Sequence, residues 1–159
     1  MTEGETIISA FAVSVLSPSQ IGRNTIAARE RFDLAAEANP DNARRLRARF
    51  QKWLLTLGTP AVLVDDLVLA VYEALANVVE HAYPPDHPQP VMRLQARVDH
   101  HHLLITISDH GRWRPLPAEP GYRGRGLAMM RSLSTELHLH PTPEGTTVQL
   151  RADLHSPGD

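Results

Sequence analysis

One stretch of this chain, residues 65–83, is apolar around nearly its whole circumference when arranged as a helix, yet it carries polar side chains at a regular spacing. A helix that is apolar on all sides belongs in a core rather than on a surface. Glu73, Asn77 and His81 recur every four residues, which places the three side chains on one face. Because a buried carboxylate or amide is costly without a partner, the stretch predicts a buried helix whose stripe meets something polar.

The polar stripe allows two interpretations. A carboxylate one turn from an amide oxygen can hold a divalent metal while the carboxylate stays free to take a proton, and this combination suits phosphoryl transfer. Alternatively, a Glu and an Asn four residues apart occur by chance in many helices and hydrogen-bond a neighbouring loop. The choice between the two depends on the rest of the chain.

Length and composition restrict the class of protein. A chain of 159 residues, 42% of them hydrophobic, is long enough for one domain with a core. The formal net charge of −2 gives no overall field that attracts nucleic acid or an anionic membrane. The absence of cysteine excludes disulfides, iron–sulfur clusters and thiolate zinc sites. No apolar run approaches the length of a membrane span, and the acidic N-terminus differs from a secretory signal, so we expect a cytoplasmic protein.

The pattern along the chain predicts one domain with two flanking segments. Residues 1–28 show no clear period, and we expect an N-terminal extension or linker of uncertain order there. The domain is expected over residues 29–154, followed by a C-terminal tail over residues 155–159. The expected elements, in order, are a strand at 31–36, a helix between Asn39-Pro40 and Gly58, a helix from Thr59-Pro60 to Tyr83, strands at 91–98 and 103–108, a long loop at 109–126, a helix at 127–133, and a hairpin with strands around 137–139 and 146–150. This order predicts an α+β fold, a two-layer α/β sandwich with helices on one face of a mixed, mainly antiparallel sheet.

The helix after Pro40 is amphipathic. Its inward stripe consists of Leu46, Phe50, Trp53, Leu54 and Leu57. Five basic residues lie outside that stripe or at its edges: Arg44, Arg45, Arg47, Arg49 and Lys52. This basic cluster fits a solvated face or a contact with an acidic protein better than a contact with nucleic acid.

Four segments, taken in order, resemble the motifs of a known family. The segments are residues 73–83, Asp109-His110-Gly111, Gly124-Arg125-Gly126-Leu127 and Gly145-Thr146-Thr147-Val148. They resemble the N, G1, G2 and G3 boxes of the Bergerat-fold (GHKL) ATPases, and the likeness is greatest to the anti-sigma factor serine/threonine kinases of bacteria, because residues 123–133 are similar to their G2 segment. The resemblance covers about residues 30–152 and implies a histidine-kinase-like ATPase fold with ATP and Mg²⁺ as cofactors.

The resemblance implies a role for the residues of the first two motifs. Asn77 would bind the magnesium ion through its amide oxygen. Glu73, partly desolvated among alanines, would be the catalytic base that accepts the proton of an incoming serine or threonine hydroxyl. Asp109 would accept a hydrogen bond from the adenine amino group, and Gly111 would let the adenine approach the backbone.

The third motif is expected to bind the phosphates. Gly124, Gly126 and Leu127 lie at the start of a predicted helix, where free backbone N–H groups favour phosphate. Arg123 and Arg125 would neutralise the γ-phosphate during transfer. A position facing solvent or a partner protein fits these two arginines equally well.

Other polar residues have weaker or purely structural interpretations. Thr146 or Thr147 would border the adenine pocket, although a threonine pair in a terminal strand is also common in ordinary β-structure. His81 is expected to be a packed or capping residue at the end of its helix. The histidines at 100–102 are expected to crowd a hairpin turn rather than bind metal, because neighbouring strand residues point to opposite faces.

The function that the resemblance implies is phosphorylation of an anti-sigma factor antagonist by a kinase that also sequesters a sigma factor. Direct contact with nucleic acid or membrane is not expected, and a homodimer is compatible with the family likeness. A rival interpretation is an ATP-binding regulatory module with little or no kinase activity that acts by binding a partner. A third is the ATPase domain of a larger sensor or phosphatase protein.

Overall fold

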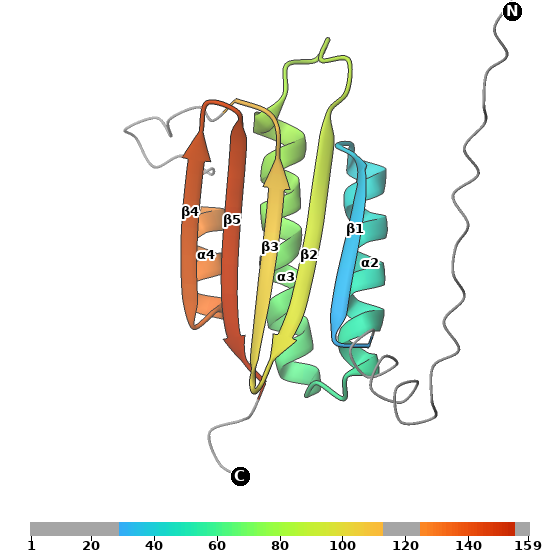
Figure 1. Ribbon diagram of the computed structural model, residues 1–159, viewed down its shortest axis with the longest axis vertical. Helices are drawn as coiled ribbons and strands as arrows, with labels where there is room; N and C mark the ends of the chain where they lie inside the picture. Colours follow the sequence, from blue (N-terminus) through green and yellow to red (C-terminus); the bar gives the residue numbers. More distant parts are fainter. Residues whose placement is uncertain (1–28, 113–124, 155–159) are drawn as a thin grey trace, which may run out of the picture.

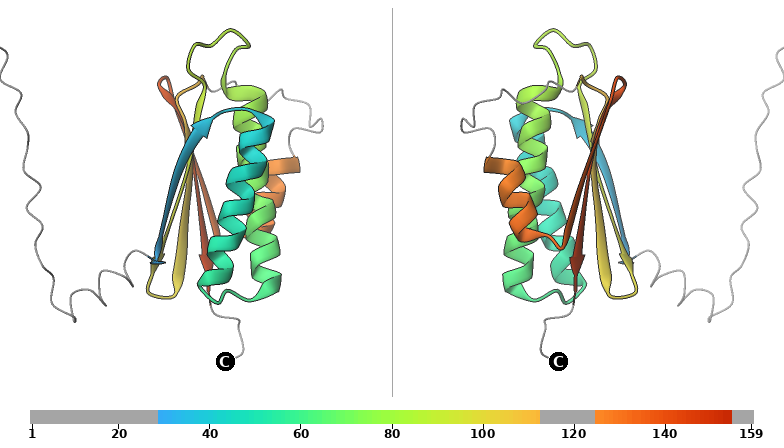
Figure 2. Two further views of the ribbon diagram at one scale, coloured as in Figure 1. Left: turned by 90° about the vertical axis from the view of Figure 1, so that its right-hand side faces the viewer. Right: turned by 90° about the vertical axis from the view of Figure 1, so that its left-hand side faces the viewer.

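Five strands pair into one sheet in the order β1-β2-β3-β5-β4, and each neighbouring pair is antiparallel. The computed structural model describes residues 29–112 and 125–154 (Figure 1). Its elements are β1 (Arg31–Glu37), α2 (Pro40–Thr56), α3 (Ala61–Asn77), η1 (Val78–Ala82), β2 (Val91–Asp99), β3 (His102–Asp109), α4 (Arg125–Leu133), β4 (Glu136–Thr142) and β5 (Gly145–Asp153). The helices cover one face of the sheet (Figure 2), so the predicted two-layer α+β sandwich is confirmed. The expected extension at 1–28, the expected tail at 155–159 and residues 113–124 of the expected loop lie outside the described residues.

Local signals explain where α2 begins and ends. The Asn39 side chain accepts a hydrogen bond from the Asn42 backbone N–H at 2.9 Å, and Pro40 occupies the first helical position. Gly58 follows the helix with φ +73°, and its N–H donates to the Leu55 carbonyl at 3.1 Å. A glycine in this left-handed conformation is a common helix C-cap, and the predicted stop signal at Gly58 is confirmed.

The core lies between the sheet and the helices. In β2 and β3 alternate residues are buried, as expected for strands with one covered face. The large, fully buried side chains come from both layers and include Phe50 and Leu54 of α2, Leu67 and Leu75 of α3, Met92 and Leu94 of β2, Leu103, Ile105 and Ile107 of β3, Met130 of α4 and Leu150 of β5. The buried apolar residues that recur every second position in the strands therefore pack against the buried apolar residues that recur every three or four positions in the helices.

The helix with the polar stripe differs from the prediction at its end. The α-helix is regular only as far as Asn77, and Val78–Ala82 form a π-helix. The Ala82 carbonyl accepts a hydrogen bond from the Arg112 N–H at 2.9 Å, so the end of η1 is joined to the segment after β3. Because a π turn holds more residues than an α turn, the regular α-helical spacing is interrupted after Asn77. The prediction of one regular α-helix over this stretch is therefore wrong beyond Asn77.

The remaining bounds lie close to the predicted ones. α4 begins at Arg125, two residues before its expected start, so Gly126 lies in its first turn. The hairpin of β4 and β5 is tighter than expected, because Thr142 already pairs with Gly145. Along the described parts of the chain, no helix combines the length and the apolar character needed to cross a membrane.

Candidate functional site

The end of β3, the start of β5 and the end of η1 meet at one junction. A Cβ atom added to Gly111 would lie 2.0 Å from the carbonyl oxygen of Ala82, and one added to Gly145 would lie 2.0 Å from the carbonyl oxygen of Asp109. Both distances are far inside van der Waals contact, so only glycine permits these backbone approaches. The two glycines therefore fix the packing of the G1-like segment between the other two.

Asp109 is the polar centre of this junction. Its side chain is only 8% exposed, and Oδ1 accepts hydrogen bonds from the N–H groups of Gly111 at 2.9 Å and Thr146 at 3.3 Å. Burial raises the pKa of Asp109, and the two backbone hydrogen bonds partly oppose this shift. Within residues 29–112 and 125–154, no group donates to Oδ2, so this oxygen can accept a hydrogen bond from a ligand.

Tyr83 connects the same junction to the sheet, and its role was not anticipated from the sequence. Its hydroxyl donates to the Val91 carbonyl at 2.5 Å and accepts from the His110 N–H at 2.8 Å. Its ring centre lies 4.7 Å from that of His87. A tyrosine directly before two prolines, at the end of a polar helical stripe, is the signal that marks this position in the sequence.

Glu73 and Asn77 lie in the last turns of α3, four residues apart on one face. Both are half-buried, and Ala70 and Ala74 beside them are fully buried. Among the described residues, neither side chain has a hydrogen-bond or ion-pair partner. A carboxylate and an amide that are half-buried without a protein partner are available for a ligand or a metal.

The two threonines of the last motif lie on opposite faces of β5. Thr146 is buried on the side of Asp109 and supplies one of its hydrogen bonds. Thr147 is the next residue along the strand, and its side chain points to the other face, where the register places it opposite Ser108 and His140. The structure therefore brings Thr146, and not Thr147, together with Asp109.

The phosphate-binding residues expected from the sequence are only partly described. Arg125, Gly126 and Leu127 are the first three residues of α4, whereas Arg123 and Gly124 lie outside the described residues. α4 packs against α3 on the same face of the sheet (Figure 2). The backbone of the expected phosphate motif thus enters a helix that packs against α3, the helix that carries Glu73 and Asn77, and the first turn of a helix leaves N–H groups free for an anion.

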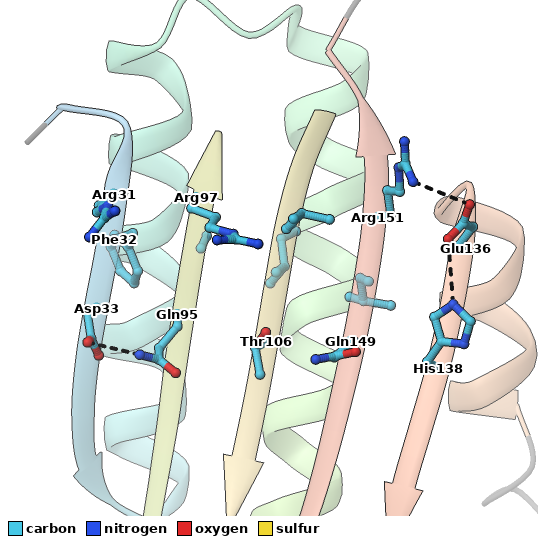
Figure 3. Close-up of a pocket in the computed structure, with 14 residues that line it drawn as sticks. Arg31, Phe32, Asp33, Gln95, Arg97, Thr106, Glu136, His138, Gln149 and Arg151 are labelled. Carbon is cyan, nitrogen blue, oxygen red and sulfur yellow. Dashed lines mark hydrogen bonds and ion pairs between the residues drawn. The ribbon is translucent and has the colours of Figure 1, made fainter. Parts of the chain in front are cut away.

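A separate groove lies on the face of the sheet that the helices leave open. Figure 3 shows this groove, which has a volume of about 580 Å³. Polar residues line it in a row across the strands, because Gln95 pairs with Asp33 and Thr106, and Thr106 pairs with Gln149. Arg93 donates two hydrogen bonds to Asp33, at 2.8 and 2.6 Å, and holds the pKa of that carboxyl below its ordinary value. None of the predicted site residues that the structure describes lines this groove, so we place the candidate site at the end of β3.

Comparisons with solved structures agree with this architecture. The structure of the RsbU and RsbW domains of Rv1364c from Mycobacterium tuberculosis matches with a TM-score of 0.67 and 26% identity, over 80% of this chain and 33% of that chain. A blue-light activated histidine kinase from Erythrobacter litoralis EL346 matches with a TM-score of 0.52 and 27% identity, over 60% of this chain and 32% of that one. The present chain thus spans about a third of the length of either protein.

A third match supports the fold alone. The SiaB–SiaC complex from Pseudomonas aeruginosa gives a TM-score of 0.55 at 12% identity, over 87% of this chain and 99% of that chain. The model of the histidine kinase-like ATPase domain matches residues 36–152, a range that includes every motif described above. The chain therefore belongs to the histidine kinase-like ATPase domain family, as the four motifs predicted.

Proposed function

We propose that this protein is an anti-sigma factor serine/threonine kinase that binds Mg-ATP, phosphorylates an anti-sigma factor antagonist and sequesters a sigma factor. The observation that carries the proposal is the pairing of a buried Asp109, whose Oδ2 has no donor among the described residues, with an unpartnered Glu73 and Asn77 on the adjoining helix. The family fixes the ATPase fold, and these side chains add the groups that phosphoryl transfer to a hydroxyl requires.

The described residues fit a bound nucleotide. Oδ2 of Asp109 would accept a hydrogen bond from an adenine amino group. The expected role of Gly111 changes, because the space beside its Cα is filled by the Ala82 backbone, and the glycine keeps the segment after β3 against η1. Thr146 holds Asp109 in place through Oδ1. Arg125, with Gly126 and Leu127, begins the helix that receives the phosphates, and Arg123 and Gly124 would complete that motif.

Glu73 and Asn77 have different tasks in this proposal. Asn77 holds magnesium through its amide oxygen, which suits an ion that keeps most of its waters. ATP would supply the phosphoryl group, and the magnesium ion bound with it would neutralise part of the phosphate charge. Glu73 accepts the proton of the serine or threonine hydroxyl of the antagonist protein, which is the role of a general base.

Calorimetric titration of the full chain with ATP, with and without magnesium, tests the site first. Magnesium-dependent binding is expected, and Asn77→Ala should abolish the magnesium dependence. Glu73→Gln should keep nucleotide binding but lose transfer of labelled γ-phosphate to the antagonist. Glu80→Gln is the matched control, because Glu80 is an exposed carboxylate in η1 whose neighbour is His81, at 3.4 Å; this variant should keep both activities. A Glu73→Gln variant with unchanged transfer would contradict the assignment of the base.

The second candidate function is an ATP-binding regulatory module without kinase activity. The match to Rv1364c favours the form of this candidate in which the module works beside other domains, since the chain matches about a third of a longer protein with RsbU and RsbW domains. In that case the chain would bind Mg-ATP with the residues named above, and binding of the sigma factor would depend on nucleotide. Phosphate transfer to the antagonist would be absent in the unmodified chain, which distinguishes the two candidates.

A further inference from the structure

The outer surface of α2 carries a stripe of positive charge that the fold does not neutralise. Arg45, Arg49 and Lys52 are spaced four and three residues apart, which places them on one side of the helix. All three side chains are exposed, and none has an ion-pair partner among the described residues. The other two basic residues of α2 each have a partner: Arg44 forms an ion pair with Asp41, and the Arg47 guanidinium lies 5.1 Å from the centre of the Tyr72 ring in a cation–π contact.

This stripe lowers the stability of the helix that carries it. Like charges at i,i+4 and i,i+3 destabilise a helix by about 0.2–0.5 kcal/mol per pair, and Arg49 has such a neighbour on each side. The helix dipole does not compensate, since the last turn of α2, where positive charge is favourable, contains no basic residue. The stripe therefore has no structural benefit within the described part of the chain.

Exposed apolar side chains lie on the same pair of helices. Among the described residues, the large hydrophobic side chains that are exposed are Leu55 (57%), Val62 (76%) and Leu69 (42%). Leu55 follows Lys52 by three residues and so continues the basic stripe of α2. Val62 lies in the first turn of α3, across the short connection from Leu55, and α2 and α3 lie side by side as the outer layer (Figure 2).

We infer that this surface, Arg45, Arg49, Lys52, Leu55 and Val62, is a docking face for an acidic, amphipathic helical segment of a partner protein. Carboxylates spaced at i, i+4 and i+7 on such a segment match the three basic side chains in spacing and charge. Leucine or isoleucine at one end of the segment would cover Leu55 and Val62. We call this surface the docking face.

Charge distribution favours an acidic partner. α2 contains five basic residues and one acidic residue, a net charge of +4, whereas the whole chain has a net charge of −2. The rest of the chain therefore carries −6. By net charge, a strongly negative segment is attracted to this helix and not to the remainder of the chain taken together, which favours this orientation of the contact.

The same observations argue against the other anionic partners. The apolar stripe of α2, including Phe50 and Leu54, is buried in the core, so no continuous apolar face remains to enter a membrane. A nucleic acid backbone would neutralise the basic residues but would leave Leu55 and Val62 exposed. Docking on this face uses neither the nucleotide site nor phosphoryl transfer, so its test is independent of the proposed function.

A synthetic helical peptide is the probe for this inference. It has 18 residues, glutamates at positions i, i+4, i+7 and i+11, and two leucines at one end; a second peptide with lysines in place of the glutamates is the counter-probe. The peptides are titrated into the full isotope-labelled chain while its amide resonances are followed. The acidic peptide should shift the amide resonances of residues 45–69, and the shifts should saturate as the peptide concentration rises. The basic peptide should not bind.

Two double variants with the same change in net charge locate the contact. Arg45→Glu with Arg49→Glu should weaken binding of the acidic peptide at least about tenfold. Arg31→Glu with Arg97→Glu is the control, because these exposed arginines face each other across β1 and β2 on the open side of the sheet, and it should change the affinity less than twofold. Both variants keep like charges at the two changed positions. The new carboxylate at position 49 also lies one turn from Lys52, a pair worth about 0.2–0.5 kcal/mol.

Leu55→Ser tests the apolar part of the docking face. Leu55 is exposed, so the midpoint of thermal unfolding should stay within a few degrees of the unmodified value, while affinity for the acidic peptide should fall several-fold. The inference is overturned if the acidic peptide fails to bind at millimolar concentration or binds both double variants equally. It is also overturned if phosphatidylglycerol vesicles or a single-stranded oligonucleotide bind this face and the acidic peptide does not.

Discussion

At the scale of single residues, one carboxylate oxygen of Asp109 joins the segment after β3 to the start of β5, and the second oxygen has no donor among the described residues. Asp109→Asn keeps an oxygen that can accept from Gly111 and Thr146 but replaces the second oxygen with an N–H₂ group. Two donors would then face each other when an adenine amino group binds, at a cost of about 1–3 kcal/mol. ATP affinity measured by calorimetry should therefore fall about tenfold or more, while the fold is retained.

The same variant should change how stability depends on pH. Because burial raises the pKa of Asp109 in the folded state, the folded protein keeps a proton at pH values where the unfolded chain has released it. The stability of the unmodified protein therefore decreases as pH rises from the ordinary carboxyl pKa to the raised folded pKa, and this loss persists above that range. Asparagine has no such loss. Urea unfolding over a pH series should show the variant gaining stability relative to the unmodified protein across this range, and a difference that shrinks with pH would contradict the assignment.

Gly111→Ala tests the close approach of the backbones. The new Cβ would lie 2.0 Å from the Ala82 carbonyl oxygen, so one of the two segments must move, at a cost of roughly 1–3 kcal/mol. Gly58→Asn is a suitable control, because Gly58 has open space around it and asparagine tolerates its positive φ. Chemical denaturation of both variants measures the difference, and equal stabilities would show that the η1 junction can relax.

At the scale of secondary-structure elements, Tyr83 fastens the end of η1 to two strands. Tyr83→Phe removes the hydroxyl that joins Val91 and His110, and loss of the two hydrogen bonds should cost about 1–3 kcal/mol. The His110 amide loses its acceptor, so its hydrogen exchange should become faster. Unchanged protection of this amide would mean that another group holds the end of β3.

The attachment of α2 to the sheet depends on an aromatic cluster. The Phe50 ring lies 5.6 Å from Phe32 of β1 and 5.8 Å from Trp53, and it has no exposed surface. Phe50→Ala should lower the free energy of unfolding by about 3–5 kcal/mol. Ala48→Ser, on the exposed side of the same helix, should change it by less than about 0.5 kcal/mol. Urea denaturation of the two variants gives the comparison.

At the scale of the whole molecule, the sequence predicts the layers well because they depend on local periodicity. Alternation in β2 and β3, the Asn39 cap and the Gly58 stop are each readable from a few neighbouring residues. The π-helix at Val78–Ala82 is not predictable in this way, because the apolar pattern of five residues is compatible with an α-helical turn and with a π-helical turn. Its position follows from the contact of Ala82 with Arg112, which no local pattern contains.

The sequence motifs propose residues for the candidate site but do not predict the contacts between them. The motifs identify Glu73, Asn77 and Asp109, yet the choice between Thr146 and Thr147 depends on which face of β5 is covered. The need for glycine at position 145 also comes from Asp109, a residue far away in the sequence. Such contacts are set by strand register and tertiary packing, and a linear pattern does not record either of them.

The pairing of β3 with β5 joins residues 102–108 to residues 147–153, and the Asp109 junction lies at the end of that pairing. Chain closure over so many residues is entropically expensive and is recovered only when the whole sheet forms. The Asp109 junction therefore depends on a long-range pairing, and loss of the β3–β5 pairing would remove the Thr146 contact from it. A nucleotide that binds at this junction and is present at a hundred times its dissociation constant would then stabilise the whole sheet against unfolding by about 2.7 kcal/mol.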